Sequence, residues 1–419
     1  MGRIELRAFL MTRFEYCEVR DVTERLAAPL APEDQVVQSM PDVSPTKWHR
    51  AHTTWFFETF ILGPHLAGYE PLHPTYAYLF NSYYEAAGPR YTRSERGLLS
   101  RPTVDEVTSY RAYVDAAMQR LLATSQEPVD LVQLGLHHEQ QHQELLVMDI
   151  KHVLSRNPLH PSYDDLRVAA PGEQSPVSWL DFEGGLVSVG HDGDGFSFDN
   201  ECPRHDTFLN PYRLADRPVT NGEWREFMAD GGYERAELWL SDGWYAVQSC
   251  DWKAPLYWEA DGDRWNVMTL AGLRPVHDDE PVCHVSHYEA DAFARWAGGR
   301  LPTEFEWEHA VTSSGVEPAG GRFLATDVLH PLAAPVGGGL RQAYGDVWEW
   351  TASPYIAYPG FRPAAGAVGE YNGKFMSNQI VLRGGCCATP VGHIRSTYRN
   401  FFPPSARWAF SGLRLATDA

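Results

Sequence analysis

Residues 136–146 constrain this chain more than any other segment, and they read LHHEQQHQELL. If this segment is a helix, His138 and His142 lie four positions apart on one face, one turn above the other. Two imidazoles with that spacing can bind one metal ion. The segment therefore predicts a helix that contributes two ligands to a metal site.

Two other interpretations of the same helix stay open. A polar helix at the protein surface can carry a pair of histidines that bind nothing. A zinc protease would use Glu139 as its general base, but it would need another ligand farther along the chain. Residues 143–150 contain no His-x-x-Gly-x-x-His continuation. A third ligand is therefore better sought upstream.

Residues 47–60, which read KWHRAHTTWFFETF, also have the pattern of an amphipathic helix. They include His49 and His52, which are three positions apart, so only one of the two needs to face the other helix. Facing helices of a bundle commonly assemble a metal site from their side chains. Three neutral imidazoles would leave about half of the coordination positions open, which suits O2 and two substrates and favours iron over a structural zinc.

Composition limits the class of protein. The chain has 419 residues, enough for two domains, and its 43% apolar content is ordinary for a globular protein. The formal net charge of -20 argues against nucleic acid or an anionic membrane as a partner. No apolar run approaches the length of a membrane span.

The ends and the cysteines suggest a cytoplasmic enzyme. Residues 1–7 carry charges and show no signal-peptide pattern. The six cysteines are too few and too scattered for a disulfide framework in so long a chain.

Residues 1–160 are predicted to form a four-helix bundle. Apolar residues recur at spacings of three and four in segments 22–30, 48–62, 104–124 and 129–154, with Pro-rich breaks between them. Thr103 and Glu106 have the pattern of a capping box. The connection 71–100 is long and aromatic, and loops of that length in compact domains are usually functional.

The composition and periodicity of the sequence change after residue 160. Residues 161–176 are rich in Pro and Gly and are predicted to be a linker. Residues 177–419 consist of short Gly- and Trp-rich segments, with a sustained helical period only at 219–229 and 288–297. A domain of this kind is expected to fold through loops and short strands.

Four motifs in residues 177–419 carry a resemblance to a known family. They are FDNECP (198–203), PVTN (218–221), GRLPTEFEWE (299–308) and GDVWEW (345–350). They resemble the formylglycine-generating-enzyme/sulfatase-modifying fold, a C-type-lectin-like domain, while residues 1–160 resemble the DinB-like bundle with a three-histidine metal site. The pairing covers essentially the whole chain and is similar to the iron-dependent sulfoxide synthases of ergothioneine biosynthesis and to the related selenoneine synthases. It implies an α+β protein.

The resemblance also implies roles for particular residues. The family's iron ligands fall on His52, His138 and His142, and its cofactor is Fe(II). Hercynine, the trimethylated betaine of histidine, is the implied substrate, with Gln141 against its imidazole. The segment Arg399-Asn400-Phe401 matches an Arg-Asn-aromatic motif in which the Asn binds the hercynine carboxylate.

The chain departs from the family at two places. Members that use gamma-glutamylcysteine carry an acidic residue where this chain has Phe402. Other members place a tyrosine just before the segment VLRGG (381–385), where this chain has NQI (378–380). Tyr83 and Tyr84 resemble instead the paired tyrosines of the cysteine-using branch, with Arg90 and Arg93 nearby to hold a carboxylate. A tyrosine there can supply a proton or a hydrogen atom.

The resemblance predicts oxidative C–S bond formation at imidazole C2 of hercynine, with O2 and a small thiol such as cysteine, giving hercynyl-cysteine sulfoxide. The alternative donor is a selenosugar, which would give a C–Se bond and make the chain a selenoneine synthase. A formylglycine-generating enzyme proper would need a copper-binding cysteine pair, and Cys386 and Cys387 are adjacent rather than spaced for chelation. A binding module without activity is disfavoured because the implied ligands are all present.

Overall fold

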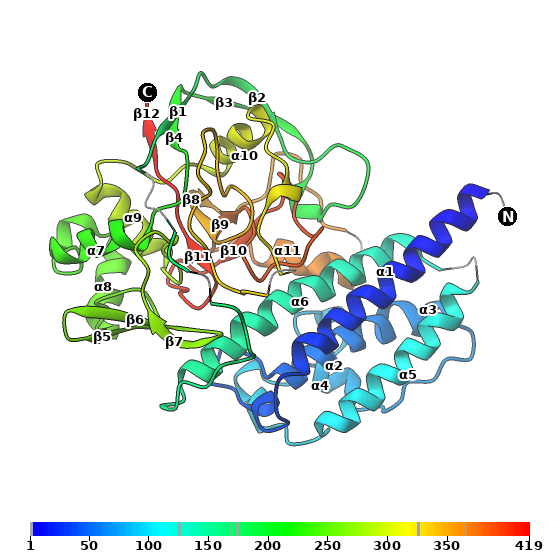
Figure 1. Ribbon diagram of the computed structural model, residues 1–419. Coiled ribbons are helices and arrows are strands. Elements are labelled where there is room, and N and C mark those ends of the chain that lie inside the picture. Colours follow the sequence, from blue (N-terminus) through cyan, green and yellow to red (C-terminus); the bar gives the residue numbers. More distant parts are fainter. Residues whose placement is uncertain (1–2, 125–126, 169, 173–175, 325–326, 365) are drawn as a thin grey trace. The chain divides into compact units, whose positions relative to one another are not determined.

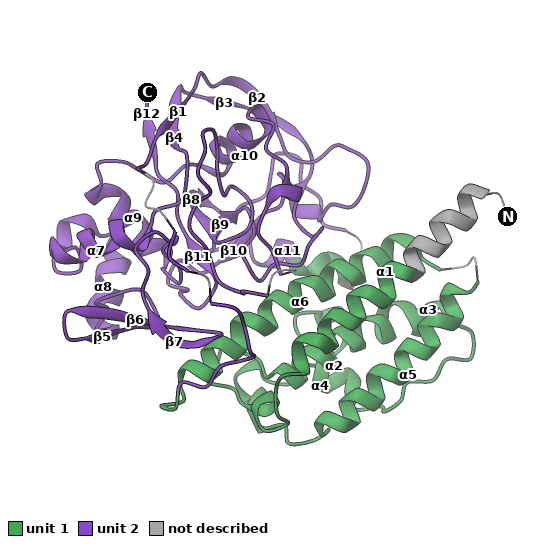
Figure 2. Ribbon diagram, in the orientation of Figure 1, with its two compact units in different colours: residues 1–159, 365–371 green, residues 160–364, 372–419 purple. Residues whose placement is uncertain are grey.

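The computed structural model describes residues 3–124, 127–168, 170–172, 176–324, 327–364 and 366–419, with side chains described from residue 14 onward except at 367. The chain divides into two compact units (Figure 2). Unit 1 consists of residues 1–159 and 365–371, and unit 2 of residues 160–364 and 372–419. The return of 365–371 to the helical unit was not foreseen from the sequence.

Unit 1 is built from helices α1 (Arg3–Ala27), α2 (Thr46–Phe56), α5 (Val104–Leu122) and α6 (Val129–Ser155). These helices contact one another, with α2 packed against both α5 and α6 (Figure 1). A π-helical turn, η2 (Phe57–Leu62), continues α2. Helix α1 begins earlier than the segment 22–30 predicted and ends before Pro29, because the residue before a proline disfavours the helical conformation.

Short elements fill the connections of unit 1. They are η1 (Asp34–Val36), α3 (Gly63–His65), α4 (Tyr76–Phe80), η3 (Glu85–Ala87) and η4 (Arg93–Leu98). The capping box predicted at the start of α5 is confirmed, since the Thr103 side chain accepts from the Glu106 N–H and the Glu106 carboxylate accepts from the Thr103 N–H. Among the described residues, no helix is long and apolar enough to cross a membrane.

Unit 2 contains small sheets rather than one large sheet. Strands β1 (Trp179–Phe182), β4 (Tyr212–Ala215) and β12 (Ala416–Asp418) form one, and β2 (Gly185–Val189) pairs with β3 (His205–Leu209). Strands β10 (Asn400–Phe402), β9 (Ile380–Arg383), β8 (Trp348–Pro354) and β11 (Ser411–Gly412) lie in that order in another. Strands β5 (Trp258–Asp261), β6 (Arg264–Thr269) and β7 (Gly272–Pro275) form a fourth sheet. The described pairings are antiparallel apart from β8 with β11.

Helices of unit 2 include two that the sequence analysis missed. Helices α7 (Asn221–Ala229) and α9 (His287–Trp296) confirm the two helical periods predicted there. Helices α8 (Ser241–Cys250) and α10 (Glu304–Ser313) were not predicted, and short turns complete the unit at η5 (Asp199–Glu201), η6 (Ala236–Leu238) and η7 (Pro318–Gly320). The turn η8 (Ala367–Gly369) belongs to unit 1, and α11 (Glu370–Lys374) begins in unit 1 and ends in unit 2. The buried face of α10 carries carboxylates, which hides its helical period from a hydrophobicity pattern.

Buried carboxylates on α10 and β8 explain two of the motifs. Glu304 binds Arg399 through Nε and Nη2 at 2.8 and 2.9 Å, and it also accepts from Arg383 at 3.0 Å. Glu349 of the GDVWEW motif holds Arg414 in the same two-pronged manner, and both side chains are completely buried. A buried carboxylate paired with a guanidinium fork fixes the geometry of its surroundings. The α+β class expected from the sequence is confirmed.

Candidate metal centre

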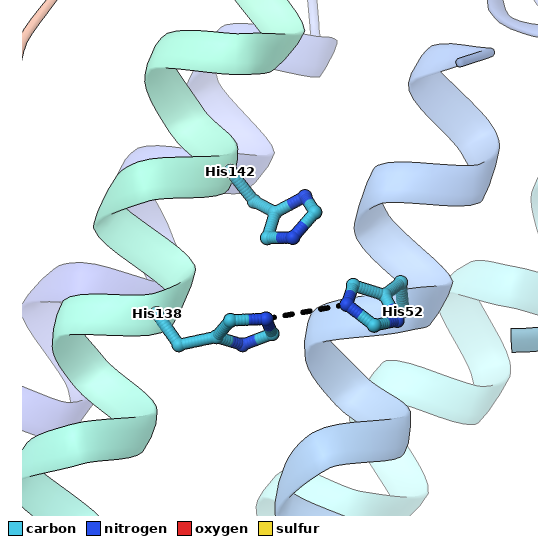
Figure 3. Close-up of side chains that lie close together, drawn as sticks. All are labelled: His52, His138 and His142. Carbon is cyan, nitrogen blue, oxygen red and sulfur yellow. Dashed lines mark hydrogen bonds between the residues drawn. The ribbon is translucent and has the colours of Figure 1, made fainter. Parts of the chain in front are cut away.

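Three histidines of unit 1 point toward one another between α2 and α6 (Figure 3). His52 comes from α2, and His138 and His142 come from successive turns of α6. One ligand atom from each lies within 4.8 Å of the other two. The i, i+4 spacing of His138 and His142 thus places both imidazoles on the face of α6 that meets α2.

The protonation of His52 suits a metal ligand. Its Nδ1 lies 2.5 Å from the carbonyl oxygen of Phe80, which can only accept, so Nδ1 carries the hydrogen and Nε2 keeps its lone pair. That Nε2 faces Nε2 of His138 at 3.2 Å. Two imidazoles that bind one divalent ion at about 2.1 Å and at a right angle have their nitrogens about 3 Å apart. The 3.2 Å between the two Nε2 atoms therefore fits a cation bound by both His52 and His138.

Burial keeps the three imidazoles neutral. It lowers the pKa of His138 to about 4 and lowers the pKa of His52 and His142 well below the usual value for histidine. The neutral imidazole is the form that binds metal. At neutral pH the cluster therefore presents three uncharged nitrogen donors, which fits a divalent cation. That these residues hold iron stays a prediction.

Aromatic rings fix the orientation of the cluster. The His52 ring is stacked between Trp48 at 4.6 Å and Trp55 at 5.5 Å, measured between ring centroids. The Phe56 ring lies 4.7 Å from the His138 ring. Ring contacts of this kind restrict the rotation of an imidazole and surround it with apolar surface.

Glu139 does not have the environment of a protease base. Its Oε1 accepts from Thr23 at 2.7 Å and from Arg111 at 3.0 Å, and its Oε2 accepts from Arg20 at 2.8 Å. The carboxylate is fully buried. Both oxygens therefore bind residues of α1 and α5, and neither is available to activate water, which argues against the zinc-protease interpretation.

His49 faces the cluster as well, which the three-residue spacing from His52 did not require. Its Nδ1 lies 2.9 Å from Nδ1 of His142, and its Nε2 lies 3.0 Å from Oδ2 of Asp149. The sequence analysis did not single out Asp149. Its position seven residues after His142 places both on one face of α6 and was the signal that could have found it.

The two tyrosines of the connection 71–100 differ in environment. The Tyr83 hydroxyl accepts a hydrogen bond from Nη1 of Arg93. Tyr84 is buried, with its ring 5.1 Å from Phe60 and 5.8 Å from Trp55 between centroids. Burial raises the pKa of the Tyr84 hydroxyl, so it stays protonated. Trp55 links Tyr84 to His52 through a continuous chain of ring contacts.

The segment 366–371 supports this tyrosine pair from within unit 1. The Glu370 carboxylate accepts from the backbone N–H groups of Glu85 at 2.8 Å and Ala86 at 3.1 Å. The Tyr371 ring lies 6.2 Å from the Tyr83 ring. A tyrosine from the C-terminal half of the sequence therefore does reach the helical unit, although none stands directly before the segment 381–385.

The arginines of the same connection are arranged unequally. Arg90 is exposed, donates to the Ser82 carbonyl at 2.9 Å and pairs with Glu85 at 3.0 Å. Arg93 donates to Tyr83 and to the Asp42 carbonyl. Arg96 of the same connection is buried, with its guanidinium 3.4 Å from the centroid of the Trp48 ring.

Arg96 is notable because no carboxylate of the described residues pairs with it. Its Nη1 and Nη2 donate instead to the hydroxyls of Ser44 at 2.9 Å and Ser82 at 3.2 Å. Burial and then the neighbouring Arg93 lower the pKa of this guanidinium, the Asp149 carboxylate offsets part of that effect, and the guanidinium stays charged at neutral pH. A buried cation whose hydrogen-bond partners are all neutral favours a further anion beside Asp149.

The remaining predicted binding residues lie in two places. Gln141 is half-buried on α6, directly before His142. Asn400 and Phe401 belong to unit 2, on β10. The Asn400 Oδ1 accepts from the Phe401 N–H at 2.9 Å, and the Phe401 ring stacks on Tyr355 with centroids 4.1 Å apart.

Comparison with known proteins identifies relatives of the whole chain. The profile of the sulfatase-modifying factor enzyme 1-like domain matches residues 168–419. A hercynine oxygenase of Mycolicibacterium smegmatis is 34% identical over 91% of this chain and 92% of its own length. The hercynine oxygenase of Mycobacterium tuberculosis is 34% identical over 90% and 92%. A formylglycine-generating enzyme of Streptomyces coelicolor is 30% identical over only 54% of this chain and 84% of its own.

Proposed function

The chain belongs to the hercynine oxygenase family, and on that premise we propose that it joins C2 of the hercynine imidazole to a small thiol such as cysteine, in a reaction that uses Fe(II) and O2. Membership confirms the resemblance drawn from the motifs. The observation that carries the proposal is the cluster of three neutral imidazoles in unit 1, because such a donor set suits a cation with positions left open for small molecules.

The proposed metal ligands are Nε2 of His52 and the facing nitrogens of His138 and His142. When bound, iron supplies a centre at which O2 and the sulfur donor are brought together and electrons are exchanged. The protein's own contribution is to hold three neutral imidazoles in place with the Phe80 carbonyl and the rings of Trp48 and Trp55. Restricting both substrates to one geometry lowers the entropy cost of their reaction.

Roles in hercynine recognition are proposed for Gln141 and for Asn400, each from the family resemblance. Gln141 can offer its amide to the hercynine imidazole, and the Asn400 amide can offer N–H groups to the carboxylate. The stacking of Phe401 on Tyr355 supports this assignment, because it fixes the backbone of β10 beside Asn400. Both roles rest on the family resemblance.

Arginines are proposed to bind the carboxylate of the donor. Arg93 is anchored by Tyr83 and the Asp42 carbonyl, and Arg90 lies on the same connection. The buried charge of Arg96 supports an anionic donor, because a carboxylate or thiolate nearby would offset the cost of burying the guanidinium. Hydroxyl groups of a sugar could use the same donors, so the selenosugar stays the alternative.

We expect Tyr83→Phe and Tyr84→Phe to retain substrate binding while diverting turnover, for example to simple thiol oxidation. The proposed role is to supply a proton during the reaction, and removal of such a group commonly costs about 10²- to 10⁴-fold. Each Phe keeps the ring, and with it the packing of residue 84 against Phe60 and Trp55 and of residue 83 against Tyr371. Product ratios by mass spectrometry and binding titrations check the expectation.

Tyr76→Phe serves as the matched control for these variants, because Tyr76 is a buried tyrosine of the same connection that packs on Phe80 and Tyr110. It should behave as the parent protein. Unchanged rate and product in both single variants and in the double variant would contradict the tyrosine assignment.

A competition among donors tests the reaction itself. With hercynine, Fe(II) and O2 present, we expect cysteine to be used in preference to gamma-glutamylcysteine. The Phe402 ring packs against Trp408. In members that use gamma-glutamylcysteine, an acidic residue at this position would pair with the glutamyl amine. Loss of one such hydrogen bond costs roughly 1.5–3 kcal/mol, or about tenfold to a hundredfold in preference for that donor. Products formed from an equimolar mixture of cysteine, gamma-glutamylcysteine and a selenosugar are identified by mass.

The variant Phe402→Asp sharpens this competition, since it should raise the use of gamma-glutamylcysteine. A dominant gamma-glutamyl sulfoxide from the parent protein would show the argument from Phe402 to be wrong. A dominant selenium product would assign the chain to the selenosugar alternative.

A further inference from the structure

We infer that His49 and Asp149 form a positioning pair that fixes the tautomer of His142, so that His142 presents a bare Nε2 to the metal. The inference rests on the proposed metal site and adds two residues to it that bind neither metal nor substrate. It follows from the chain of hydrogen bonds that links Asp149 to His49 and His49 to His142, in which each donor and acceptor assignment determines the next.

The first step concerns the carboxylate of Asp149. Oδ2 of Asp149 accepts from the Ser44 N–H at 2.8 Å and lies 3.0 Å from Nε2 of His49. An ionised carboxylate only accepts hydrogen bonds, so Nε2 of His49 carries a hydrogen, and an imidazole with one hydrogen then has none on Nδ1. Its Nδ1 then has a lone pair.

The second step fixes His142. Nδ1 of His49 lies 2.9 Å from Nδ1 of His142, and two ring nitrogens at this distance require one hydrogen between them. Because Nδ1 of His49 accepts, Nδ1 of His142 donates, and the lone pair of the His142 ring is left on Nε2. The opposite arrangement would place an N–H where a metal ligand is needed.

The tautomer of His52 is fixed in the same way, but by a backbone carbonyl. The Phe80 carbonyl accepts from its Nδ1 and leaves Nε2 bare. For His142 the acceptor is a side chain, and that side chain needs Asp149 to settle its own tautomer. Both nitrogens of His49 are thereby occupied, which explains why His49 faces the cluster without serving as a ligand.

Burial protects the hydrogen bonds of the pair from water. His49 and Asp149 are 2% and 3% exposed, so exchange of their hydrogen bonds with water is restricted. Helix α2 supplies His49 one turn before His52, and α6 supplies Asp149 two turns after His142. The two helices that carry the ligands therefore also carry the residues that orient one of them.

Anaerobic Fe(II) titration of His49 variants tests the positioning role. His49→Leu removes the acceptor and should weaken Fe(II) binding by about 10- to 100-fold, as is typical when a group that orients a metal ligand is lost. His49→Asn places an amide oxygen close to the former Nδ1 and should restore most of the affinity. His287→Leu is the control, because His287 is also buried but lies on α9 of unit 2.

Equal loss of affinity in His49→Leu and His49→Asn would overturn the inference, because packing rather than the acceptor would then matter. Parental affinity in His49→Leu would overturn it as well. Thermal unfolding of each variant identifies any that fail to fold.

The tautomers can also be observed directly by nuclear magnetic resonance, without a measurement of iron binding. Ring ¹⁵N resonances of the metal-free protein, labelled at histidine and assigned with His49→Asn and His142→Ala, should show N–H at Nε2 of His49 and at Nδ1 of His142. The reverse pattern would overturn the inference. A parent protein that shows the expected tautomers but binds no Fe(II) would refute the proposed function and leave the positioning pair in place.

Discussion

Replacement of His52, His138 or His142 by alanine should abolish stoichiometric Fe(II) binding and, with it, turnover. Each substitution removes one of three nitrogens that lie within 4.8 Å of one another. Loss of a group that merely orients a ligand costs about 10- to 100-fold in affinity, so loss of a ligand should exceed that range. Iron content after anaerobic reconstitution and removal of excess metal measures the effect.

His137→Ala is the matched control, because His137 neighbours His138 on α6 and lies outside the predicted ligand set. It should retain one equivalent of iron. Stoichiometric iron in His52→Ala would refute the ligand assignment. A parent protein that binds copper and refuses Fe(II) would refute the iron site altogether and favour the chemistry of a formylglycine-generating enzyme.

The metal cluster was open to prediction because part of it is local. His138 and His142 are separated by one helical turn, and helical geometry alone places them on one face. Spacing could not choose between His49 and His52, and only the family resemblance pointed to His52. The structure shows why the choice is subtle, since both rings face α6 and differ in which nitrogen is already hydrogen-bonded.

The partners of Glu139 could not be predicted in the same way. The carboxylate follows His138 directly, in the position that a zinc protease uses for its base. Its partner Arg20 is 119 residues away in sequence, and nothing local identifies that contact. The unforeseen helix α10 has the same cause, since Glu304 pairs with Arg383 and Arg399 far along the chain. Buried ion pairs are tertiary features, and a hydrophobicity pattern records their residues as polar.

Glu139→Ala should destabilise unit 1 strongly. It leaves the guanidinium groups of Arg20 and Arg111 buried without this carboxylate, and breaking a buried ion pair from one side costs about 3–5 kcal/mol in free energy of unfolding. Glu139→Gln keeps the volume and one acceptor and should cost less. Urea unfolding monitored by far-ultraviolet circular dichroism gives the difference, with Glu18→Ala, an exposed position on α1, as the control within about 0.5 kcal/mol.

The same network predicts how stability depends on pH. Burial alone would raise the pKa of Glu139, but Arg20, Arg111 and the Thr23 hydrogen bond outweigh it and lower the pKa from 4.5 to about 2. Below pH 4.5 the unfolded chain takes up a proton that the folded protein does not, so this stabilisation is complete above pH 4.5 and is lost as the pH falls toward 2. Glu139→Gln lacks the titrating group, so its stability deficit should shrink over that interval. A deficit independent of pH, or a Glu139→Ala protein within 1 kcal/mol of the parent (roughly the value of one ordinary hydrogen bond), would show that the carboxylate does not hold α1, α5 and α6 together.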